Sequence, residues 1–173
     1  VGKMIDIHSH ILWGVDDGPD RLEETLQLLE YAVKEGITEI ISTSHSDHPY
    51  YDVNYQIIIN KINLLQEMLI EHRIPITIHA GHEMRLSENI ISNYQSNEIH
   101  TLANSQYLLL ELPSTTVPFY TENIIRDLLK EGITPIIAHP ERNKAIANQP
   151  SKLEKLIYSG ALAQITAGSL TGH

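Results

Sequence analysis

The sequence predicts an α/β fold with a mostly parallel sheet, and two observations support this prediction. Short apolar runs alternate with longer segments in which apolar residues recur at helical spacing. Strands that alternate with helices are joined by crossover connections, so neighbouring strands are expected to run parallel. In addition, "KEGITEIISTSH" (34–45) and "KEGITPIIAHP" (130–140) repeat one pattern, in which a helix end, a glycine and an apolar strand lead to a histidine.

Six apolar runs are predicted strands, and five amphipathic segments are predicted helices. The strands are predicted at Met4–His8, Glu39–Ser44, Ile76–Ala80, Tyr107–Leu112, Pro135–Ala138 and Ala163–Thr166. The first helix is predicted from Leu22, Leu26, Leu29 and Val33, which recur at helical spacing, with Asp20 as its N-cap and Gly36 just beyond its end. The other helices are predicted at Ile57–Ile70, Ser87–Tyr94, Glu122–Lys130 and Ser151–Tyr158.

Composition limits the classes of function. With 173 residues and 42% hydrophobic content, the chain can bury a core, and we expect one domain over residues 1–173. The formal net charge of −10 argues against nucleic acid and against an anionic membrane surface as partners. The absence of cysteine excludes a thiolate nucleophile and is typical of a cytoplasmic protein. No apolar run approaches the roughly 18 residues of a membrane span, so membrane insertion is not expected.

The stretch "MIDIHSH" places His8 and His10 one residue apart at the end of the first predicted strand. Side chains on a strand alternate between its two faces, so both imidazoles are expected to point the same way and to reach one ion. The chain contains 10 histidines, so this pair alone is weak evidence for a metal site. The prediction depends on further ligand-type residues at equivalent places.

Each of the first five predicted strands ends in an imidazole or a carboxylate. These residues are His8, His10, Asp16 and Asp17 after the first strand, His45 after the second, Glu83 after the third, Glu111 on the fourth, and His139 and Glu141 after the fifth, where Arg142 follows them. The carboxyl ends of parallel strands meet at one edge, where catalytic residues of α/β folds gather. The sequence therefore predicts one site built from these ends.

Glu111 is the most informative member, because it interrupts the otherwise apolar run "YLLLEL". A carboxylate in a strand covered on both faces is costly unless it is paired or coordinated, although an edge strand facing water would also accept it. Nitrogen and carboxylate ligands without sulfur suit Zn, Mn, Fe or Mg. The number of candidate ligands exceeds the needs of one tetrahedral ion, which favours more than one metal.

Other polar and aromatic residues near these strands have two interpretations. His48, in "SDHPYY", is either a solvated loop residue, which is the preferred interpretation, or a residue at the mouth of the site. Surface packing is likewise preferred over lining of a substrate groove for four tyrosines, Tyr50, Tyr51, Tyr55 and Tyr120.

Taken together, "DIHSH", "DDGP", "STSH", "GHE", "LLELP", "AHPERN" and "ITAGSLTG" resemble the polymerase and histidinol phosphatase (PHP) superfamily. Within it they resemble the bacterial protein-tyrosine phosphatases associated with capsule or exopolysaccharide synthesis. The likeness runs from Met4 to the last residue. It implies a distorted (β/α)7 TIM-like barrel and three divalent ions, most often manganese, with iron, magnesium, cobalt or zinc as alternatives. It also implies hydrolysis of phosphotyrosine on a partner, a bacterial tyrosine kinase.

The resemblance also implies individual roles. The metal ligands would be His8, His10 and Glu83 for the first ion, Glu83, Glu111 and His139 for the second, and Asp17 and His45 for the third. Arg142 matches the catalytic arginine of the family. The family takes two further ligands from a late Asp-x-His segment, which His173 and its preceding "TG" do not supply. We therefore expect a barrel that is incomplete at its C-terminal end, with open first and third sites.

The expected function is metal-dependent hydrolysis of phosphotyrosine, in which Arg142 contacts the phosphate oxygens. One alternative is a PHP phosphoesterase that acts on histidinol phosphate or a similar small phosphomonoester. A second is a noncatalytic module, stabilised by metals, that binds a kinase. The sequence also allows a homo-oligomer.

Overall fold

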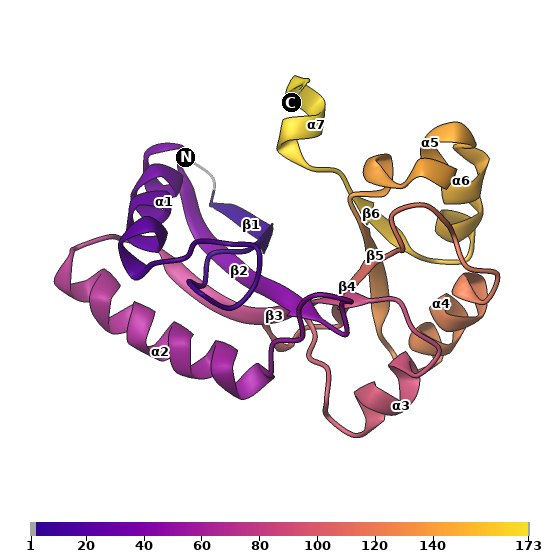
Figure 1. Cartoon of the computed structure of the whole chain (residues 1–173), viewed down its shortest axis with the longest axis horizontal. Helices are drawn as coiled ribbons and strands as arrows, with labels where there is room; N and C mark the ends of the chain where they lie inside the picture. The colour runs from indigo at the N-terminus through magenta and orange to yellow at the C-terminus, as the bar shows by residue number, and fades with distance from the viewer. Residues whose placement is uncertain (1–2, 173) are drawn as a thin grey trace. The chain divides into compact units, whose positions relative to one another are not determined.

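The computed structural model describes residues 3–172, and in this range strands and helices alternate along the chain (Figure 1). The strands are β1 (Met4–Ser9), β2 (Ile37–Ser46), β3 (Thr77–Arg85), β4 (Tyr107–Glu111), β5 (Thr134–Ala138) and β6 (Leu162–Gln164). The α-helices are α1 (Leu22–Lys34), α2 (Tyr55–Glu71), α3 (Ile90–Gln95), α4 (Thr121–Lys130), α5 (Lys144–Asn148), α6 (Ser151–Tyr158) and α7 (Ala167–Thr171). Two 3-10 turns, η1 (Leu102–Asn104) and η2 (Pro140–Arg142), complete the set.

The chain divides into two compact units, and the division falls inside β3. Unit 1 comprises Val1–His82 and His100–Ser105, and unit 2 comprises Glu83–Ile99 and Gln106–His173. Each unit has its own core of buried apolar residues. The single domain expected from the sequence stays a prediction, and the two units are described separately below.

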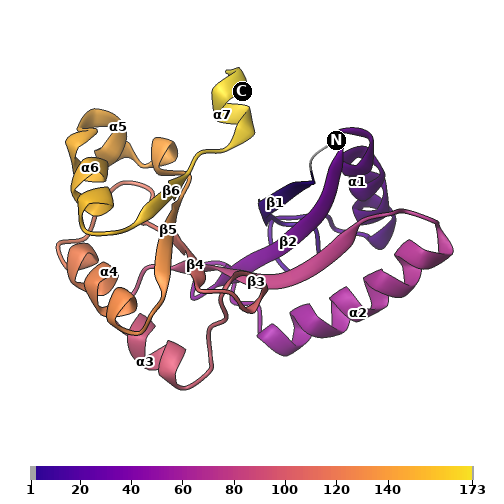
Figure 2. The same ribbon diagram turned by 180° about the vertical axis from the view of Figure 1, so that it is seen from behind.

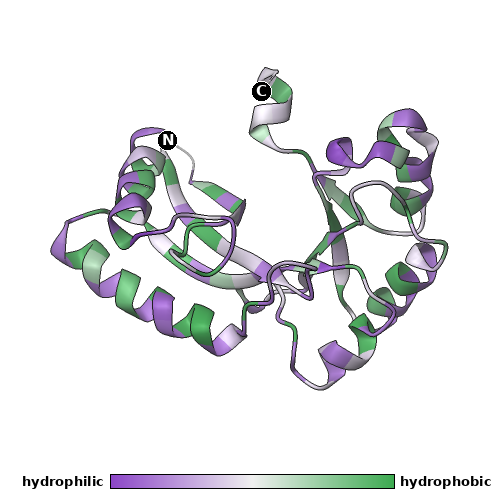
Figure 3. Cartoon of the chain, in the orientation of Figure 1, coloured by the Kyte–Doolittle hydropathy of each residue, from purple (hydrophilic) through white to green (hydrophobic). Residues whose placement is uncertain are grey.

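In unit 1 the strands follow the order β1-β2-β3, and β1 pairs with β2 in parallel. In both ribbon views α1 lies beside β2, and α2 runs alongside β3 (Figures 1 and 2). Apolar and polar residues alternate along α2, as expected of a helix with one buried face (Figure 3). The fully buried side chains of this core include Leu12, Leu29, Ile58 and Leu65.

The first helix begins after Arg21, so the prediction of Asp20 as its N-cap is wrong. The carboxylate of Glu24, in the first turn, accepts the backbone N–H groups of Asp20 (3.0 Å) and Arg21 (3.3 Å). These N–H groups are therefore satisfied from inside the helix. The next helix, α2, is capped in the usual way, because the Asn54 side chain accepts the N–H of Gln56 at 2.8 Å.

In unit 2 the end of β3 pairs in parallel with β4, followed by β5 and β6 in chain order. Side chains alternate between the two faces of β4. Leu108 and Leu110 enter the core of unit 2, whereas Leu109 and Glu111 project from the other face. This alternation explains how an acidic residue fits into an apolar strand: it lies on the face opposite that core.

The strand predictions are confirmed, with shifts at the ends. The largest shift is in β3, which continues to Arg85 because its last residues pair with β4. Two short helices, α5 and α7, were not predicted, and α3 begins at Ile90 rather than at Ser87. The predicted α/β class with parallel strands is confirmed, and six strands lie in the described part of the chain, fewer than in a (β/α)7 barrel. No helix in that part is long and apolar enough to span a membrane.

Candidate metal centre

Unit 1 brings three of the predicted ligands together at the carboxyl ends of β1 and β2. The Nδ1 atom of His10 lies 3.1 Å from Oδ1 of Asp17, and that oxygen lies 3.6 Å from Nε2 of His45. One ligand atom from each of the three residues falls within 4.8 Å of the other two. Imidazole nitrogen and carboxylate oxygen are donors that divalent ions accept. Nε2 is the ring nitrogen of His10 that remains for an ion, because its Nδ1 lies against the carboxylates of Asp16 and Asp17.

His8 and His10 face each other through their Nε2 atoms, which are 3.4 Å apart. Two nitrogens bound at about 2.0–2.1 Å to one tetrahedral ion lie roughly 3.4 Å apart. The pair therefore has the separation of two ligands on one ion, and unit 1 holds four of the predicted ligands.

Asp16 is the functional residue of unit 1 whose role the sequence did not reveal. Its side chain is fully buried (0% exposed), and its Oδ2 atom accepts from Nδ1 of His10 (3.0 Å) and from the N–H of His45 (3.2 Å). Its Oδ1 atom accepts the N–H of Gly18 at 3.1 Å. Asp16 thus orients one ligand imidazole and fixes the backbone of another, as outer carboxylates do around metal-binding histidines.

The pKa of Asp16 reflects this environment. Burial by itself would raise the pKa, but the hydrogen bond and the charge of His10, with the N–H donors of Gly18 and His45, lower it below its usual value. Asp16 is therefore ionised at neutral pH. The Nδ1–H of His10 donates to it, which directs Nε2 of His10 toward His8.

Two glycines in "WGVDDGP" allow these carboxylates to reach the end of β1. A Cβ on Gly18 would overlap the carbonyl oxygen of His10, so this position requires glycine. Gly14 has a φ of +64°, and its N–H donates to the carbonyl oxygen of Pro19 at 2.7 Å. The loop therefore folds back tightly on the histidine pair.

Unit 2 brings Glu83 and His139 together. Oε1 of Glu83 lies 2.7 Å from Nε2 of His139, and the Glu83 side chain is almost completely buried. Burial would lower the pKa of His139, but the hydrogen bond and the negative charge of Glu83, helped by Glu111, raise it above its usual value. A proton now holds these two groups together, and a divalent ion would replace it, since metal ligands must be deprotonated.

The backbone of His139 is strained. Its φ of +30° lies in the left-handed region, which is uncommon for a residue other than glycine. Such a conformation costs about 1–3 kcal/mol and is concentrated at functional sites. Pro140 follows it and starts η2, which carries Arg142.

Glu111 has a cationic partner within unit 2. Arg85 is directly opposite Glu111 in the β3–β4 register, and its Nη1 atom lies 3.0 Å from Oε2 of Glu111. Both side chains are mostly buried. Arg85 was not a predicted site residue. The sequence feature that could have identified Arg85 is its position two residues after Glu83, because this spacing places both side chains on one face of β3.

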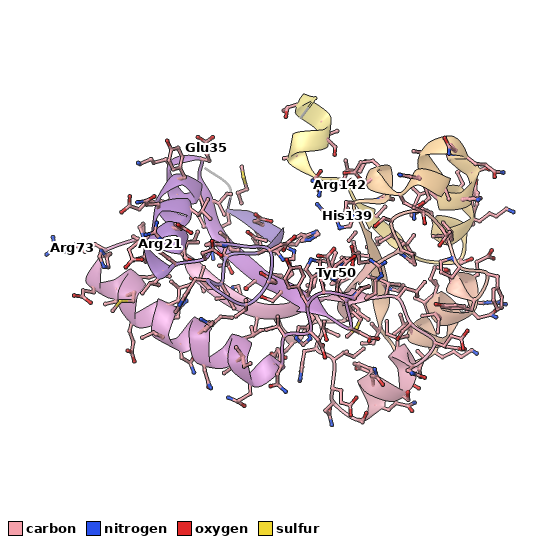
Figure 4. The ribbon with its side chains drawn as sticks, in the orientation of Figure 1. Arg21, Glu35, Tyr50, Arg73, His139 and Arg142 are labelled. Carbon is pink, nitrogen blue, oxygen red and sulfur yellow. The ribbon has the colours of Figure 1, made fainter. Side chains whose placement is uncertain are left out.

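Arg142 lies three residues beyond His139, and Figure 4 shows both side chains at the end of β5. Arg142 is exposed, and its Nη2 atom donates to Oγ1 of Thr166 at 3.4 Å. The next residue, Asn143, is buried and fixes the segment. Its amide donates to the carbonyl oxygens of Pro113 (2.7 Å) and Thr116 (2.9 Å), and its Oδ1 accepts the N–H of Ile146 (3.0 Å).

The predicted residues thus fall into two groups. Unit 1 assembles His8, His10, Asp17 and His45, and unit 2 assembles Glu83, Glu111, His139 and, at its edge, Arg142. The donors are nitrogen and oxygen only. In unit 1 the ligand atoms of His10, Asp17 and His45 lie within 4.8 Å of one another, as on a divalent cation, whereas in unit 2 Glu83 and His139 lie at hydrogen-bonding distance. The ion that Glu83 is expected to share with His8 and His10 stays a prediction.

Comparison with known proteins agrees with these motifs. Residues 4–173 match the family described as "Capsular polysaccharide synthesis, CpsB/CapC". CapC from Staphylococcus aureus is 41% identical over 169 residues, and the tyrosine-protein phosphatase YwqE from Bacillus subtilis (strain 168) is 37% identical over 169. Each of these two alignments covers 98% of this chain and 66% of the relative. This chain therefore spans slightly less than two thirds of the length of CapC and YwqE.

A solved structure gives the same result for the fold. It belongs to a pair, YwqE from Bacillus subtilis and CpsB from Streptococcus pneumoniae, described as metal-dependent tyrosine phosphatases. The TM-score is 0.95 at 37% sequence identity, over 98% of this chain and 68% of that one. The tyrosine-protein phosphatase CpsB of Streptococcus pneumoniae is 34% identical over 164 residues, covering 95% of this chain and 68% of CpsB. By its motifs, its fold and these matches, this chain belongs to the CpsB/CapC family of capsular polysaccharide synthesis proteins.

Proposed function

We propose that this protein is a metal-dependent tyrosine-protein phosphatase. The main support is the placement of histidines and carboxylates at the carboxyl ends of parallel strands, with separations that suit divalent ions. The names of YwqE and CpsB support the substrate class. The chain has no cysteine, so its own side chains offer no thiolate to attack phosphorus.

In this proposal divalent ions supply Lewis acidity toward the phosphate oxygens and an activated water. Asp16 keeps the His10 imidazole in the orientation that ligation needs. Glu83 and His139 would hold an ion in place of the proton that now lies between them. Arg142 makes a bidentate contact with the nonbridging phosphate oxygens as negative charge moves onto them in the transition state.

The finer assignments belong to the same proposal. The ligand set is His8, His10, Asp17, His45, Glu83, Glu111 and His139, and it holds up to three ions, manganese above all. The phosphotyrosine is carried by a protein partner, a bacterial tyrosine kinase that controls capsule or exopolysaccharide synthesis. These assignments are supported by the family resemblance and by the two ligand groups.

A substrate panel tests the proposal. The purified chain, supplied with Mn²⁺, is incubated with a phosphotyrosine peptide, with the same peptide carrying phosphoserine, and with histidinol phosphate, and the released phosphate is measured. We expect release from the phosphotyrosine peptide in clear excess over the others. Release from histidinol phosphate alone would assign the chain to another PHP phosphoesterase. Tight binding of a tyrosine kinase without release from any substrate would make it a noncatalytic module.

A further inference from the structure

The loop that joins β2 to α2 in unit 1, residues 47–54, carries aromatic side chains that the proposed chemistry does not use. It begins directly after His45 and Ser46, so it is attached to a candidate metal ligand. The relevant side chains are His48, Tyr50 and Tyr51. We call them, with His45, the ring stack.

Three members of the ring stack lie nearly parallel. The rings of His45 and His48 are 4.5 Å apart at an interplanar angle of 24°. The ring of Tyr51 lies 5.8 Å from that of His45, at 10°, and 5.7 Å from that of His48, at 17°. His48 is half-buried and stacks on a candidate ligand. It lies in a loop, as predicted, and its interpretation as a solvated residue or as one at the mouth of the site stays open.

The loop is held in place by hydrogen bonds at both ends. The Asp52 carboxylate accepts from Oγ of Ser46 (3.3 Å) and from the N–H of Asp47 (3.0 Å), whose φ is +56°. The N–H of Val53 donates to the carbonyl oxygen of His45 (2.9 Å), and the carbonyl oxygen of Val53 accepts from Nε2 of the buried His82 (3.1 Å). The ring stack is therefore preorganised in the absence of a ligand.

Tyr50 is the most exposed member of the ring stack. Its ring lies 5.7 Å from that of His48 at 55°, and its N–H lies 3.3 Å from Nδ1 of His48. The side chain is 85% exposed. An exposed aromatic ring, tied by its backbone to a fixed stack that begins at a candidate ligand, has one face available for an aromatic partner.

We infer that the exposed ring of Tyr50 is a recognition platform for the aryl ring of the phosphotyrosine substrate. This inference rests on the proposed function and specifies its substrate selectivity. When the metal group of unit 1 holds the phosphate, the aryl ring of the substrate lies one ester bond away from it. Tyr50 contacts His48, which stacks on His45 of that group. The neighbouring charges of the loop are acidic, Asp47 and Asp52, which disfavours a second anion and favours an uncharged ring.

The test is a binding comparison that does not depend on turnover. Benzylphosphonate, an aryl mimic of phosphotyrosine, and ethylphosphonate, an alkyl analogue, are titrated into the Mn²⁺-loaded protein by calorimetry. We expect Tyr50→Ala to raise the Kd of benzylphosphonate about three- to tenfold, as for the loss of one aromatic pair, with the Kd of ethylphosphonate unchanged. Tyr50→Phe keeps the ring and should bind both ligands like the unmodified protein.

Tyr158→Ala is the matched control, because Tyr158 is 90% exposed and lies at the end of α6 in unit 2. Metal content is measured for every variant. An unchanged Kd for benzylphosphonate in Tyr50→Ala, or an equal loss of both phosphonates, would overturn the inference and leave the proposed function standing. Failure of the Mn²⁺-loaded unmodified protein to bind either phosphonate would overturn the proposed function and the inference with it.

Discussion

At the residue scale, one buried carboxylate determines the geometry of the unit 1 ligand group. Asp16 and Asp17 are neighbours with the same chemistry, and the sequence offers no means of telling which one is buried. In the structure Asp17 faces His10 and His45 as a candidate ligand, whereas Asp16 is enclosed and holds both histidines in place. The difference arises from the close turn at Gly18, which is a property of the folded loop.

Asp16→Asn should therefore weaken metal binding without removing a ligand. Loss of an outer carboxylate partner costs about 10- to 100-fold in metal affinity, and we expect a rise in the Kd for Mn²⁺ of that order, measured by calorimetry. The exposed Asp20 provides the control, Asp20→Asn, which should bind Mn²⁺ normally. Normal affinity in Asp16→Asn would contradict this role.

The same substitution has a defined dependence on pH. The pKa of Asp16 is lowered from 3.8, so its ionised form contributes stability that is complete above that value. This contribution is lost as the pH falls through the lowered pKa. In thermal unfolding of chelated protein, the excess stability over Asp16→Asn should therefore be constant near neutrality and shrink in strong acid. A difference that grows on acidification would contradict the assignment.

The stability that His139 contributes should depend on pH in the opposite direction. Its pKa is raised from 6.5, so the pairing with Glu83 stabilises chelated protein fully below pH 6.5. The contribution disappears as the pH rises through the raised pKa. Between pH 5.5 and 8.5, the free energy of unfolding of the chelated unmodified protein should thus exceed that of His139→Gln by an amount that decreases as the pH rises. A margin that increases with pH would show that His139 is neutral in the pair.

At the element scale, the sequence predicts the buried strands, but it does not predict helix caps and short helices, which depend on local contacts. The strands were located because buried parallel strands form nearly continuous apolar runs. The N-cap of α1 was misassigned because the side chain of Glu24 substitutes for a capping residue. Helices as short as α5 and α7 contain too few residues for a helical period to be recognised.

The HPERN segment gives the prediction that belongs to this scale. Asn143 holds it through three hydrogen bonds, so Asn143→Ala should destabilise the protein by about 1–3 kcal/mol and displace Arg142. We expect kcat on a phosphotyrosine peptide to fall toward that of Arg142→Ala while the bound metal is unchanged. Asn148→Ala, at the exposed end of α5, is the control. Loss of metal in Asn143→Ala would assign the segment to ligand support instead.

At the scale of the whole molecule, two compact units each organise part of one predicted ligand set. The ends of the apolar strands predicted the candidates for this set, and the family resemblance selected its members among them. The sequence did not predict the supporting contacts, namely Asp16 beneath the histidines, Arg85 on Glu111 and the ring stack on His45. These contacts depend on how loops turn and on the register between strands. Neither produces a periodic pattern in the sequence, so neither could be predicted from it.

In the proposed function, cations held by these ligands, rather than a nucleophile of the protein, promote cleavage of the phosphate ester. Metal titration tests this: bound metal is followed by elemental analysis alongside phosphate release from a phosphotyrosine peptide, as Mn²⁺ is returned to exhaustively chelated protein. We expect no release from chelated protein and a rate that rises with the metal bound. Undiminished release from protein shown to contain no metal would exclude a metal-dependent reaction.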